Sequence, residues 1–487
     1  MTADPAIIQG GMGVGVSDWR LAGAVARAGG LGVVSGTALE ALLARRLQTG
    51  DRGGHLREAL GAFPFPDVAE RIIGRYLRVD GRGAGQSFRP VPRLGLRPNR
   101  TRDELLVAAN FAEVFLAKRG HDGWVGVNYV EKIQLATPAA VYGAMLAGVD
   151  YVLMGAGVPA GIPQLLGSFA AGQPGEIDVN VVGAPVGAAF SVRLDPREVF
   201  GAAPILRRPR FLAIVSSHVL AAYLARDELT RPDGFVIETP VAGGHSARPR
   251  GLAQLDKTGQ PVYGPRDEPD LAKLRQLGLP FWLAGGHAGP DQLRAAQAAG
   301  AVGVQVGSVF ALCRDSGIAP PVRRAVLAEA RAGQLVVRID PAASPTGFPF
   351  KVAELAGTIA TEPVYSARQR SCDLGYLRTP YLTPQEKVGY RCPSEPVDAY
   401  VAKGGAREET VERRCICNGL TATVGLAQTR PDGYLEPALV TLGQDLNFLR
   451  ALPFDHDDYT ASDVVRYLTA KQAHDATLDP PGDSPAH

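Results

Sequence analysis

Cysteine is scarce in this sequence, with five residues in a chain of 487. So few cysteines exclude a disulfide-stapled scaffold, and the odd number is typical of a reducing compartment. No run of about 18 uncharged apolar residues occurs, which argues against a membrane-spanning helix. The first residues lack a basic segment followed by an apolar one, so no secretory signal is expected. Together these absences predict a soluble, cytoplasmic protein.

An excess of charge of one sign is missing as well. The 51 Lys and Arg residues nearly cancel the 49 Asp and Glu residues, which leaves a formal net charge of +2. This balance gives no electrostatic reason to expect nucleic acid or a membrane surface as a partner. Glycine and proline, in contrast, are abundant, with 58 and 38 residues. Their excess, without a repeat period, predicts many turns and close backbone approaches in a globular protein.

Short apolar runs alternate with alanine-rich helical segments over residues 7–310. The runs are almost entirely apolar rather than alternating, as expected for parallel strands that are buried on both faces. Eight such runs with helices between them predict an α/β protein of the TIM (β/α)8 barrel class. The predicted strands cover residues 6–9, 30–35, 124–128, 151–155, 211–216, 234–238, 280–285 and 302–307.

Three stretches do not follow this alternation. Residues 41–120 are rich in arginine and are expected to leave the barrel after the second strand. Residues 161–210 contain an extra strand-like run at 176–183 and are expected to form an insertion between the fourth and fifth strands. We therefore predict a barrel over residues 1–340 and a C-terminal extension over 341–487 that packs on it. The last dozen residues are predicted to be disordered.

A glycine-rich segment, QGGMGVGVSD, follows the first predicted strand. It does not match the G-x-G-x-x-G pattern of dinucleotide-binding folds in either frame, and no acidic residue ends the second strand. A tight strand-to-helix turn that lets backbone approach a flat ligand suits these glycines better. A turn without any ligand is the structural alternative. Ser17 is predicted to cap the helix that follows.

Two further glycine motifs, AGGH and QVGS, follow the last two predicted strands. In barrels the loops after strands seven and eight commonly bind phosphate, because free backbone N–H groups and a helix N-terminus face one point there. We therefore predict a phosphate cradle, with tight loops as the structural alternative. Its residues are Gly285, Gly286, Gly307 and Ser308, with Gln305 as a polar contact to the ligand.

The sixth predicted strand runs into the segment ETPVAGGHSARPRG. His245 follows two glycines at the end of this strand, where a barrel places its catalytic side chains. An imidazole there can remove a proton near neutral pH or hydrogen-bond a polar substrate. A structural histidine that anchors the loop is the alternative. His287 is assigned to the phosphate turn, and His218 to the packing of a helix.

Six short motifs occur in a characteristic order: IIQGGMG, VGVN at 125–128, GAGVP at 155–159, AGGH at 242–245, AGGH at 284–287 and QVGS at 305–308. This order resembles that of the nitronate monooxygenase family, formerly called 2-nitropropane dioxygenases, whose relatives include flavin-dependent enoyl reductases. The segment SPTGFPFK at 344–351 is similar to the larger members. The resemblance extends over residues 6–355 and implies a TIM barrel that binds FMN non-covalently.

The resemblance also implies a role for each motif. The first glycine motif would lie at the isoalloxazine ring, two polar side chains would contact the flavin, and the last two motifs would hold its phosphate. The implied cofactor-binding residues are Gly10, Gly11, Met12, Asn128, Gly244, Gly285, Gly286, Gln305, Gly307 and Ser308. The histidine of the family that ends the sixth strand corresponds to His245, the expected catalytic residue. The chain departs from the pattern in its greater length, in QGGM without a proline before Met, and in His287 where Ile is frequent.

Two activities are compatible with this resemblance. In the first, FMN oxidises an alkyl nitronate and O₂ reoxidises the flavin, with His245 as base or as substrate-orienting group. In the second, NAD(P)H reduces the flavin, which reduces an enoyl thioester carried by an acyl carrier protein of polyketide or fatty acid biosynthesis. A non-catalytic flavin-binding or scaffold protein is a third hypothesis. Arg89, Arg93, Arg97 and Arg100 would bind an acidic carrier or a pyrophosphate, with a solvated basic face as the alternative.

The remaining cysteines are Cys372, Cys392, Cys415 and Cys417. Four thiolates are in principle a ligand set for zinc or an iron–sulfur cluster. The spacing is unfavourable, however, because the sequence contains one C-x-C, no C-x-x-C, and two cysteines far from the others. Buried free thiols are the preferred interpretation, and no metal is expected.

Overall fold

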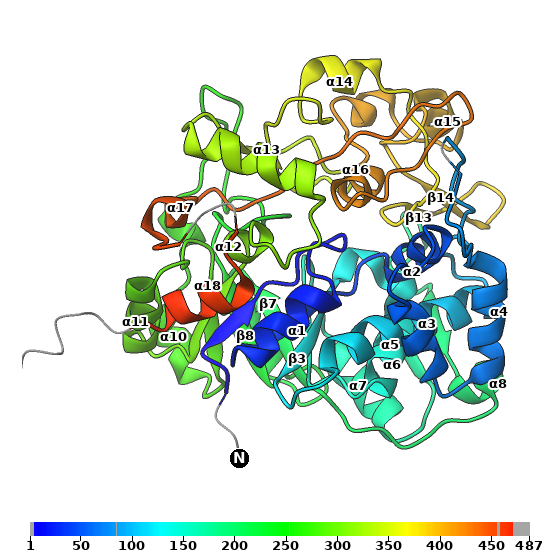
Figure 1. Cartoon of the computed structure of the whole chain (residues 1–487), viewed down its shortest axis with the longest axis horizontal. Coiled ribbons are helices and arrows are strands. Elements are labelled where there is room, and N and C mark those ends of the chain that lie inside the picture. The colour runs from blue at the N-terminus through cyan, green and yellow to red at the C-terminus, as the bar shows by residue number, and fades with distance from the viewer. Residues whose placement is uncertain (1–3, 84, 253, 455–457, 471–487) are drawn as a thin grey trace, which may run out of the picture.

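The computed structural model describes residues 4–83, 85–252, 254–454 and 458–470, and its centre is a barrel of eight parallel strands (Figure 1). All eight strands that the apolar runs predict are present, which confirms the TIM-barrel class. The strands are β1 (Ile7–Gln9), β2 (Gly32–Ser35), β3 (Val125–Val130), β4 (Tyr151–Gly155), β7 (Arg210–Val215), β8 (Gly234–Glu238), β9 (Phe281–Ala284) and β10 (Gly303–Val306).

The barrel closes between its first and second strands. The sheet runs in the order β1-β10-β9-β8-β7-β4-β3-β2, and Ile8 pairs in parallel with Leu31, just before β2. The amide of Gln9 donates to the carbonyl of Leu31 at 3.0 Å, and the amide of Leu31 donates to the carbonyl of Ile7 at 2.9 Å. Closure leaves no edge strand in the barrel and brings the carboxyl ends of all eight strands to one rim.

The interior of the barrel is filled by large apolar side chains. Ile8, Leu153, Leu212, Val236 and Trp282 belong to one buried cluster, and each comes from a different strand. The indole of Trp282 satisfies its N–H by donating to the carbonyl of Pro5 at 2.7 Å. The barrel is therefore a packed core, and open space is confined to its ends.

Helices cover the outside of the barrel. They are α1 (Trp19–Arg27), α5 (Arg100–Lys118), α6 (Thr137–Leu146), α7 (Ile162–Ala170), α9 (His218–Ala225), α10 (Leu271–Gln276) and α11 (Pro290–Ala298). The prediction that Ser17 caps the first helix is wrong, because the carboxylate of Asp18 accepts from the amides of Arg20 and Leu21. Ser17 is fully buried and binds the preceding loop instead.

The arginine-rich stretch after β2 lies only partly outside the barrel. It contains α2 (Leu39–Gln48), α3 (His55–Gly61) and α4 (Pro66–Tyr76), and it ends in α5, which packs on α1, α6 and β3. Because α5 is buried along most of its length, it belongs to the helical layer of the barrel. Arg93 donates to the carbonyl of Cys372, and Arg100 pairs with Glu104, so these two arginines already have partners in the protein.

The extra strand-like run between the fourth and fifth barrel strands does not join the barrel. It forms β5 (Gly175–Asp178), which pairs antiparallel with β6 (Ser191–Leu194) in a separate two-stranded sheet. This hairpin, followed by α8 (Pro196–Phe200), packs against α6 and α7.

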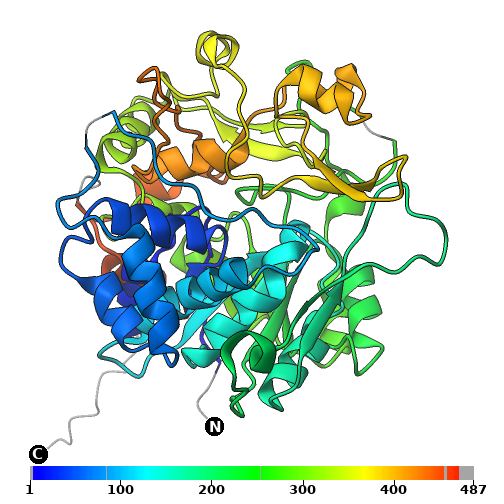
Figure 2. The same cartoon turned by 90° about the vertical axis from the view of Figure 1, so that its right-hand side faces the viewer.

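The residues after β10 form a cap over the rim of the barrel. Figure 2 shows this yellow-to-orange part above the strands. Its elements are α12 (Ser308–Ala311), α13 (Pro320–Arg331), β11 (Val337–Asp340), β12 (Phe350–Ala353), α14 (Glu362–Ala367), β13 (Thr379–Leu382), β14 (Val388–Arg391), α15 (Val397–Ala402), α16 (Ile416–Thr423) and α17 (Phe448–Ala451).

The last described helix returns to the barrel. α18 (Ala461–Leu468) packs on α1, α11 and α12, beside the blue N-terminal helix in Figure 1. It therefore occupies the place in the helical layer between the last and the first barrel strand. The sequence does not indicate this, because about 150 residues separate α18 from its strand β10.

Two further predictions concern membrane-spanning helices and the C-terminal tail. Within them, no helix is both long enough and apolar enough to cross a lipid bilayer. The dozen C-terminal residues that were predicted to be disordered lie outside the described part of the chain.

Candidate active site

A cavity of about 260 Å³ lies at the carboxyl ends of the barrel strands, which we call the mouth cavity. Every cofactor-binding and catalytic residue that the sequence predicts lines it, although these residues come from six different loops and strands. They are Gly10, Gly11, Met12, Asn128, Gly244, His245, Gly285, Gly286, Gln305, Gly307 and Ser308. The fold thus brings the predicted set together, while the role of each residue stays a prediction.

The loop after β1 is held rigidly at the floor of the mouth cavity. The hydroxyl of Ser17 accepts from the amide of Met12 at 2.9 Å and donates to the carbonyl of Gly10 at 2.9 Å. Gly11 lies against Asn128, and a Cβ on Gly11 would lie 2.3 Å from the Asn128 Cβ. A glycine is therefore required here for packing, and the backbone of this loop faces the cavity without side-chain cover.

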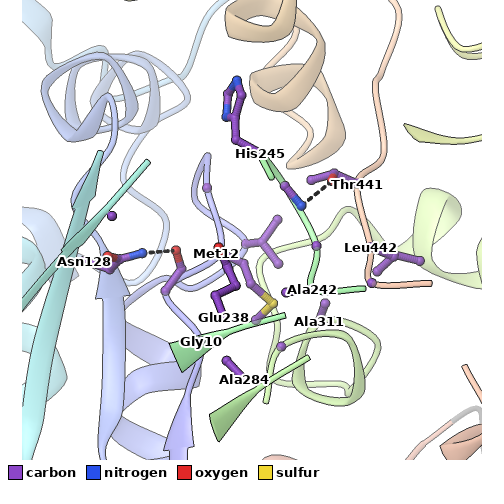
Figure 3. A pocket seen from close by; sticks show the side chains of 18 of the residues that line it. Gly10, Met12, Asn128, Glu238, Ala242, His245, Ala284, Ala311, Thr441 and Leu442 are labelled. Carbon is purple, nitrogen blue, oxygen red and sulfur yellow. Dashed lines mark hydrogen bonds between the residues drawn. The ribbon is translucent and has the colours of Figure 1, made fainter. Parts of the chain in front are cut away.

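Two half-buried amide side chains in the cavity each have a buried oxygen without a hydrogen-bond partner. Asn128 donates to the carbonyl of Gly11 at 3.2 Å, as the dashed line in Figure 3 shows, but its Oδ1 has no hydrogen-bond partner. The Oε1 atom of Gln305 on β10 also lacks a partner. A buried polar atom without a partner is costly, so both oxygens point to a bound group that carries donors.

The predicted phosphate cradle is built from left-handed glycines and from a contact with the cap. Gly285 and Gly286 have φ angles of +91° and +74°, which non-glycine residues rarely adopt. The hydroxyl of Ser308 accepts from the amide of Gly443 at 2.8 Å. Gly244 in turn donates its amide to the hydroxyl of Thr441 at 3.1 Å. The cradle is therefore closed by a segment of the cap, residues 441–445, which we call the strap.

The strap also brings a negative charge to the cradle. A Cβ on Gly286 would lie 3.8 Å from Oδ2 of Asp445, so this carboxylate stands beside the cradle. Burial lowers the pKa of the neighbouring His287, and the charge of Asp445 partly offsets this shift. An anion bound in the cradle would lie near both Asp445 and His287. The protonation state of His287 would therefore affect the binding of that anion.

His245 lies where the sequence predicts it, but its imidazole is already engaged. Its Nε2 hydrogen-bonds with the hydroxyl of Ser344 at 2.7 Å, and its ring packs edge-on against Phe350 at 4.8 Å between centroids. Figure 3 shows the ring pointing away from Met12 and Glu238. Burial, together with the positive charges of Lys132 and Lys351, lowers the pKa of His245 to about 3. The imidazole is therefore neutral at neutral pH.

A buried acid that the sequence analysis did not single out also lines the mouth cavity. Glu238 ends β8, and burial raises the pKa of its carboxyl, while the positive charge of Lys351 acts in the opposite direction. Lys351 on β12 is fully buried, its amine donates to the hydroxyl of Ser246, and burial lowers the pKa of this amine. Burial thus favours the neutral form of both groups. It raises the pKa of Glu238 to about 7, close to neutral pH.

The cap also supplies a part of the cavity wall that sequence reasoning did not assign. Tyr376, Leu377, Ile416, Cys417 and Phe448 line the cavity together with the strap. The one sequence signal from this region is the SPTGFPFK segment, which contains both Ser344 and Lys351, the partners of His245 and Glu238. His218, in contrast, lies outside the cavity, where its Nδ1 accepts from the amide of Asp270 at 3.2 Å.

Within the described residues, no three His, Cys, Asp or Glu side chains are arranged to hold a single metal ion. The polar groups that line the mouth cavity are amide, hydroxyl, carboxyl and imidazole groups and the thiol of Cys417.

No protein-family model matches the chain, and no curated protein matches it in sequence. Among solved structures, the chain is similar to FabK from Thermotoga maritima, with 16% identity, 96% of this chain and 92% of that chain covered, and a TM-score of 0.46. It is similar to a nitroalkane oxidase from Streptomyces ansochromogenes, with 18% identity, 97% of both chains and a TM-score of 0.44.

A third similar structure is the enoyl reductase domain of MlnA from the macrolactin biosynthesis cluster of Bacillus amyloliquefaciens. Its identity is 11%, the alignment covers 96% of this chain and 94% of that chain, and the TM-score is 0.46. The fold of the present chain is assigned from its own strand order and closure.

Proposed function

We propose that this chain is an FMN-dependent oxidoreductase that oxidises alkyl nitronates with O₂, as the resemblance to nitronate monooxygenases suggests. The observation that carries flavin binding is the pair of partnerless amide oxygens, on Asn128 and Gln305, in a cavity built largely from glycine turns. An isoalloxazine ring supplies donors that fit such acceptors and requires backbone without side chains on one face. The residues present therefore fit a flavin.

The cofactor is proposed to be FMN because the described residues offer one glycine cradle at the rim. The loop from Gly10 to Met12 would support the ring, and Gly286, Gly307 and Ser308 would hold the phosphate through backbone N–H groups. A bound flavin supplies the two-electron chemistry, by accepting electrons from an organic substrate and passing them to a second substrate such as O₂. The protein residues supply binding, orientation and proton transfer.

Glu238 is the group proposed to remove the substrate proton. An effective general base has a pKa near the working pH, and burial raises the pKa of this carboxyl toward that range. A histidine with a pKa of about 3 is a weak proton acceptor. Its hydrogen bond to Ser344 instead fixes the ring as a neutral donor or acceptor. We therefore assign His245 to substrate orientation, and Glu238 to proton transfer from a neutral nitroalkane.

The test is anaerobic mixing of the purified protein with a nitronate, NADH and NADPH in separate experiments, followed by flavin absorbance. Bleaching by the nitronate alone supports nitronate oxidation. Bleaching by NADH or NADPH alone contradicts it and supports a reductase. A flavin that none of the three reduces would leave a non-catalytic flavin-binding or scaffold role.

A second candidate, an NAD(P)H-dependent enoyl reductase that acts on a carrier-bound thioester, is favoured by charges near His245. The amine of Lys132 lies 3.4 Å from the centroid of the Phe348 ring, and the Arg248 guanidinium lies 5.3 Å from the same centroid. Two cations on one aromatic ring, next to a substrate cavity, suit the phosphate of a carrier-linked arm. In this reaction Glu238 would deliver the proton that accompanies hydride transfer.

The two candidates are separated by replacing both cations. The Lys132→Met, Arg248→Met protein should lose activity toward a carrier-bound enoyl thioester at least about tenfold, through KM, if these cations bind a phosphate. Activity toward a small nitronate, which carries no phosphate, should change little. Equal activity of parent and variant on the thioester contradicts the second candidate.

A further inference from the structure

Four cysteines that lie far apart in the sequence surround one small cavity in the cap. Cys372, Cys392, Cys415 and Cys417 all line it, and we call it the cysteine cavity. They come from three segments: the loop before β13, the end of β14 and the start of α16. The fifth cysteine of the chain, Cys313, is fully buried in the barrel core. The fold therefore gathers every cysteine of the cap around one cavity, which their spacing in the sequence does not indicate.

The cysteine cavity adjoins the mouth cavity. Leu377, Ile416 and Cys417 line both cavities, so one layer of side chains separates them. A group bound between the thiols would consequently lie directly behind the wall of the proposed flavin site. The placement of the cysteine cavity beside the mouth cavity follows from the protein residues alone and does not depend on flavin binding.

All four cysteines are available as ligands. None of them forms a disulfide, Cys392 and Cys415 are buried, and Cys372 and Cys417 are half-buried. A metal binds such side chains as thiolates and releases their protons.

The surroundings carry the charge that a metal–thiolate centre requires. Arg93 donates to the carbonyl of Cys372 at 2.7 Å, and the positive charges of Arg93 and Arg378 both act on its thiol. Cys415 is the residue before the first turn of α16, and the backbone amide of Asn418 in that turn hydrogen-bonds the Cys415 thiol. Four thiolates around metal have a net negative charge, and the arginines and the helix end offset it.

We propose that Cys372, Cys392, Cys415 and Cys417 bind a four-iron, four-sulfide cluster behind the wall of the mouth cavity. A single ion such as zinc needs its ligands around one point, and the described residues contain no such group. An iron–sulfur cube instead takes one cysteine at each iron, so its ligands stand apart around a larger body. Four cysteines from three segments that line one cavity match the second requirement.

The first experiment measures iron, acid-labile sulfide and zinc in the full-length protein, purified without oxygen and, in parallel, reconstituted with ferrous iron, sulfide and a thiol reductant. The expected result is about four iron and four sulfide per chain, with an electron paramagnetic resonance signal after reduction by dithionite. Zinc at one per chain without iron, or no metal in either preparation, overturns the proposal.

The second experiment uses variants. Cys392→Ser and Cys415→Ser should each lose most of the iron, whereas Cys313→Ala, which removes the thiol outside the cavity, should retain it. Circular dichroism and flavin content report whether each variant is folded. A folded Cys415→Ser protein with full iron content contradicts the assignment. If both serine variants fail to fold, the metal analysis of the parent protein still decides the proposal.

Discussion

The barrel and the cap differ in regularity, but both contribute residues to the active site. The barrel contributes Glu238 and His245 at the ends of regular βα units, where the fold fixes the position of such residues. The cap contributes the partners of these side chains, Lys351 from the short strand β12 and Ser344 from the loop before it. The repeated βα units of the barrel thus position Glu238 and His245. The cap residues affect the protonation of Glu238 and the orientation of His245.

The strongest test of this division removes the cap. A protein that ends at residue 341 lacks the strap, Lys351 and the helix α18 that completes the helical layer. We expect it to aggregate or to purify without flavin, because the apolar faces of α1 and α11 lose their cover. A control protein that ends at residue 470 should remain soluble and yellow. A soluble, flavin-loaded protein ending at residue 341 would show that the cap is a separate unit.

The next largest effect is expected for the acid and its partner. Glu238→Gln should slow turnover of a neutral nitroalkane about 10²–10⁴-fold, with little effect on a preformed nitronate. Lys351→Met removes the positive charge that opposes the raised pKa of Glu238, so the rise of the rate with pH should move to higher pH. Identical pH–rate profiles of the parent and the Lys351→Met protein would show that Lys351 does not affect the pKa of Glu238.

His245→Ala should reduce turnover less than Glu238→Gln, by about 10-fold to 100-fold on both substrates. The reason is that an orienting hydrogen bond serves the neutral nitroalkane and the nitronate alike. Ser344→Ala, which removes the partner of Nε2, should produce a smaller loss in the same direction. A loss confined to the neutral nitroalkane would identify His245 as the base, and unchanged activity on both substrates would make it structural.

Gly307→Val tests the cradle. A Cβ on Gly307 would lie 3.5 Å from the sulfur of Met12, which is an ordinary contact, so the protein itself tolerates a larger residue. Crowding of a bound phosphate should then weaken FMN binding at least about tenfold. Binding of riboflavin, which lacks the phosphate, serves as the control and should change much less. Equal loss for both ligands would locate the phosphate elsewhere.

The smallest predicted effect is the pH dependence of stability. The pKa of His245 is lower in the folded state than in the unfolded state, so its stabilising contribution is present above about pH 6.5 and is lost as the pH falls. Between pH 7.5 and pH 5 this residue should contribute a loss of about 2 kcal/mol. The decrease in Tm over this range should be smaller for His245→Gln than for the parent protein. Equal decreases would show that His245 is not the group that titrates.

Sequence periodicity predicts the barrel well because each parallel strand is a short apolar run between turns. It predicts the site residues at the strand ends for the same reason, since the fold alone brings Asn128, His245 and Gln305 to one rim. Glu238 was not recognised, because a glutamate at the end of a strand has no sequence mark of the burial that changes its pKa.

The cap was largely beyond sequence reasoning. Its contacts join segments that lie far apart, as between Gly443 and Ser308 or between α18 and α1, and no local period encodes them. The cysteines illustrate this, because a ligand set is recognised from sequence when its members are closely spaced. Here tertiary structure, rather than spacing, brings Cys372 and Cys392 to the start of α16.

The position of α18 has a consequence for the order of events during synthesis. Because this helix covers α1 and α11, the first helix of the chain keeps an exposed apolar face until nearly 470 residues have been translated. At a rate of about 5–20 residues per second this delay amounts to roughly 20–90 seconds. The nascent barrel should therefore depend on chaperones that bind apolar surface, and its ribosome-bound intermediates should become protease-resistant only after residue 468 emerges from the exit tunnel.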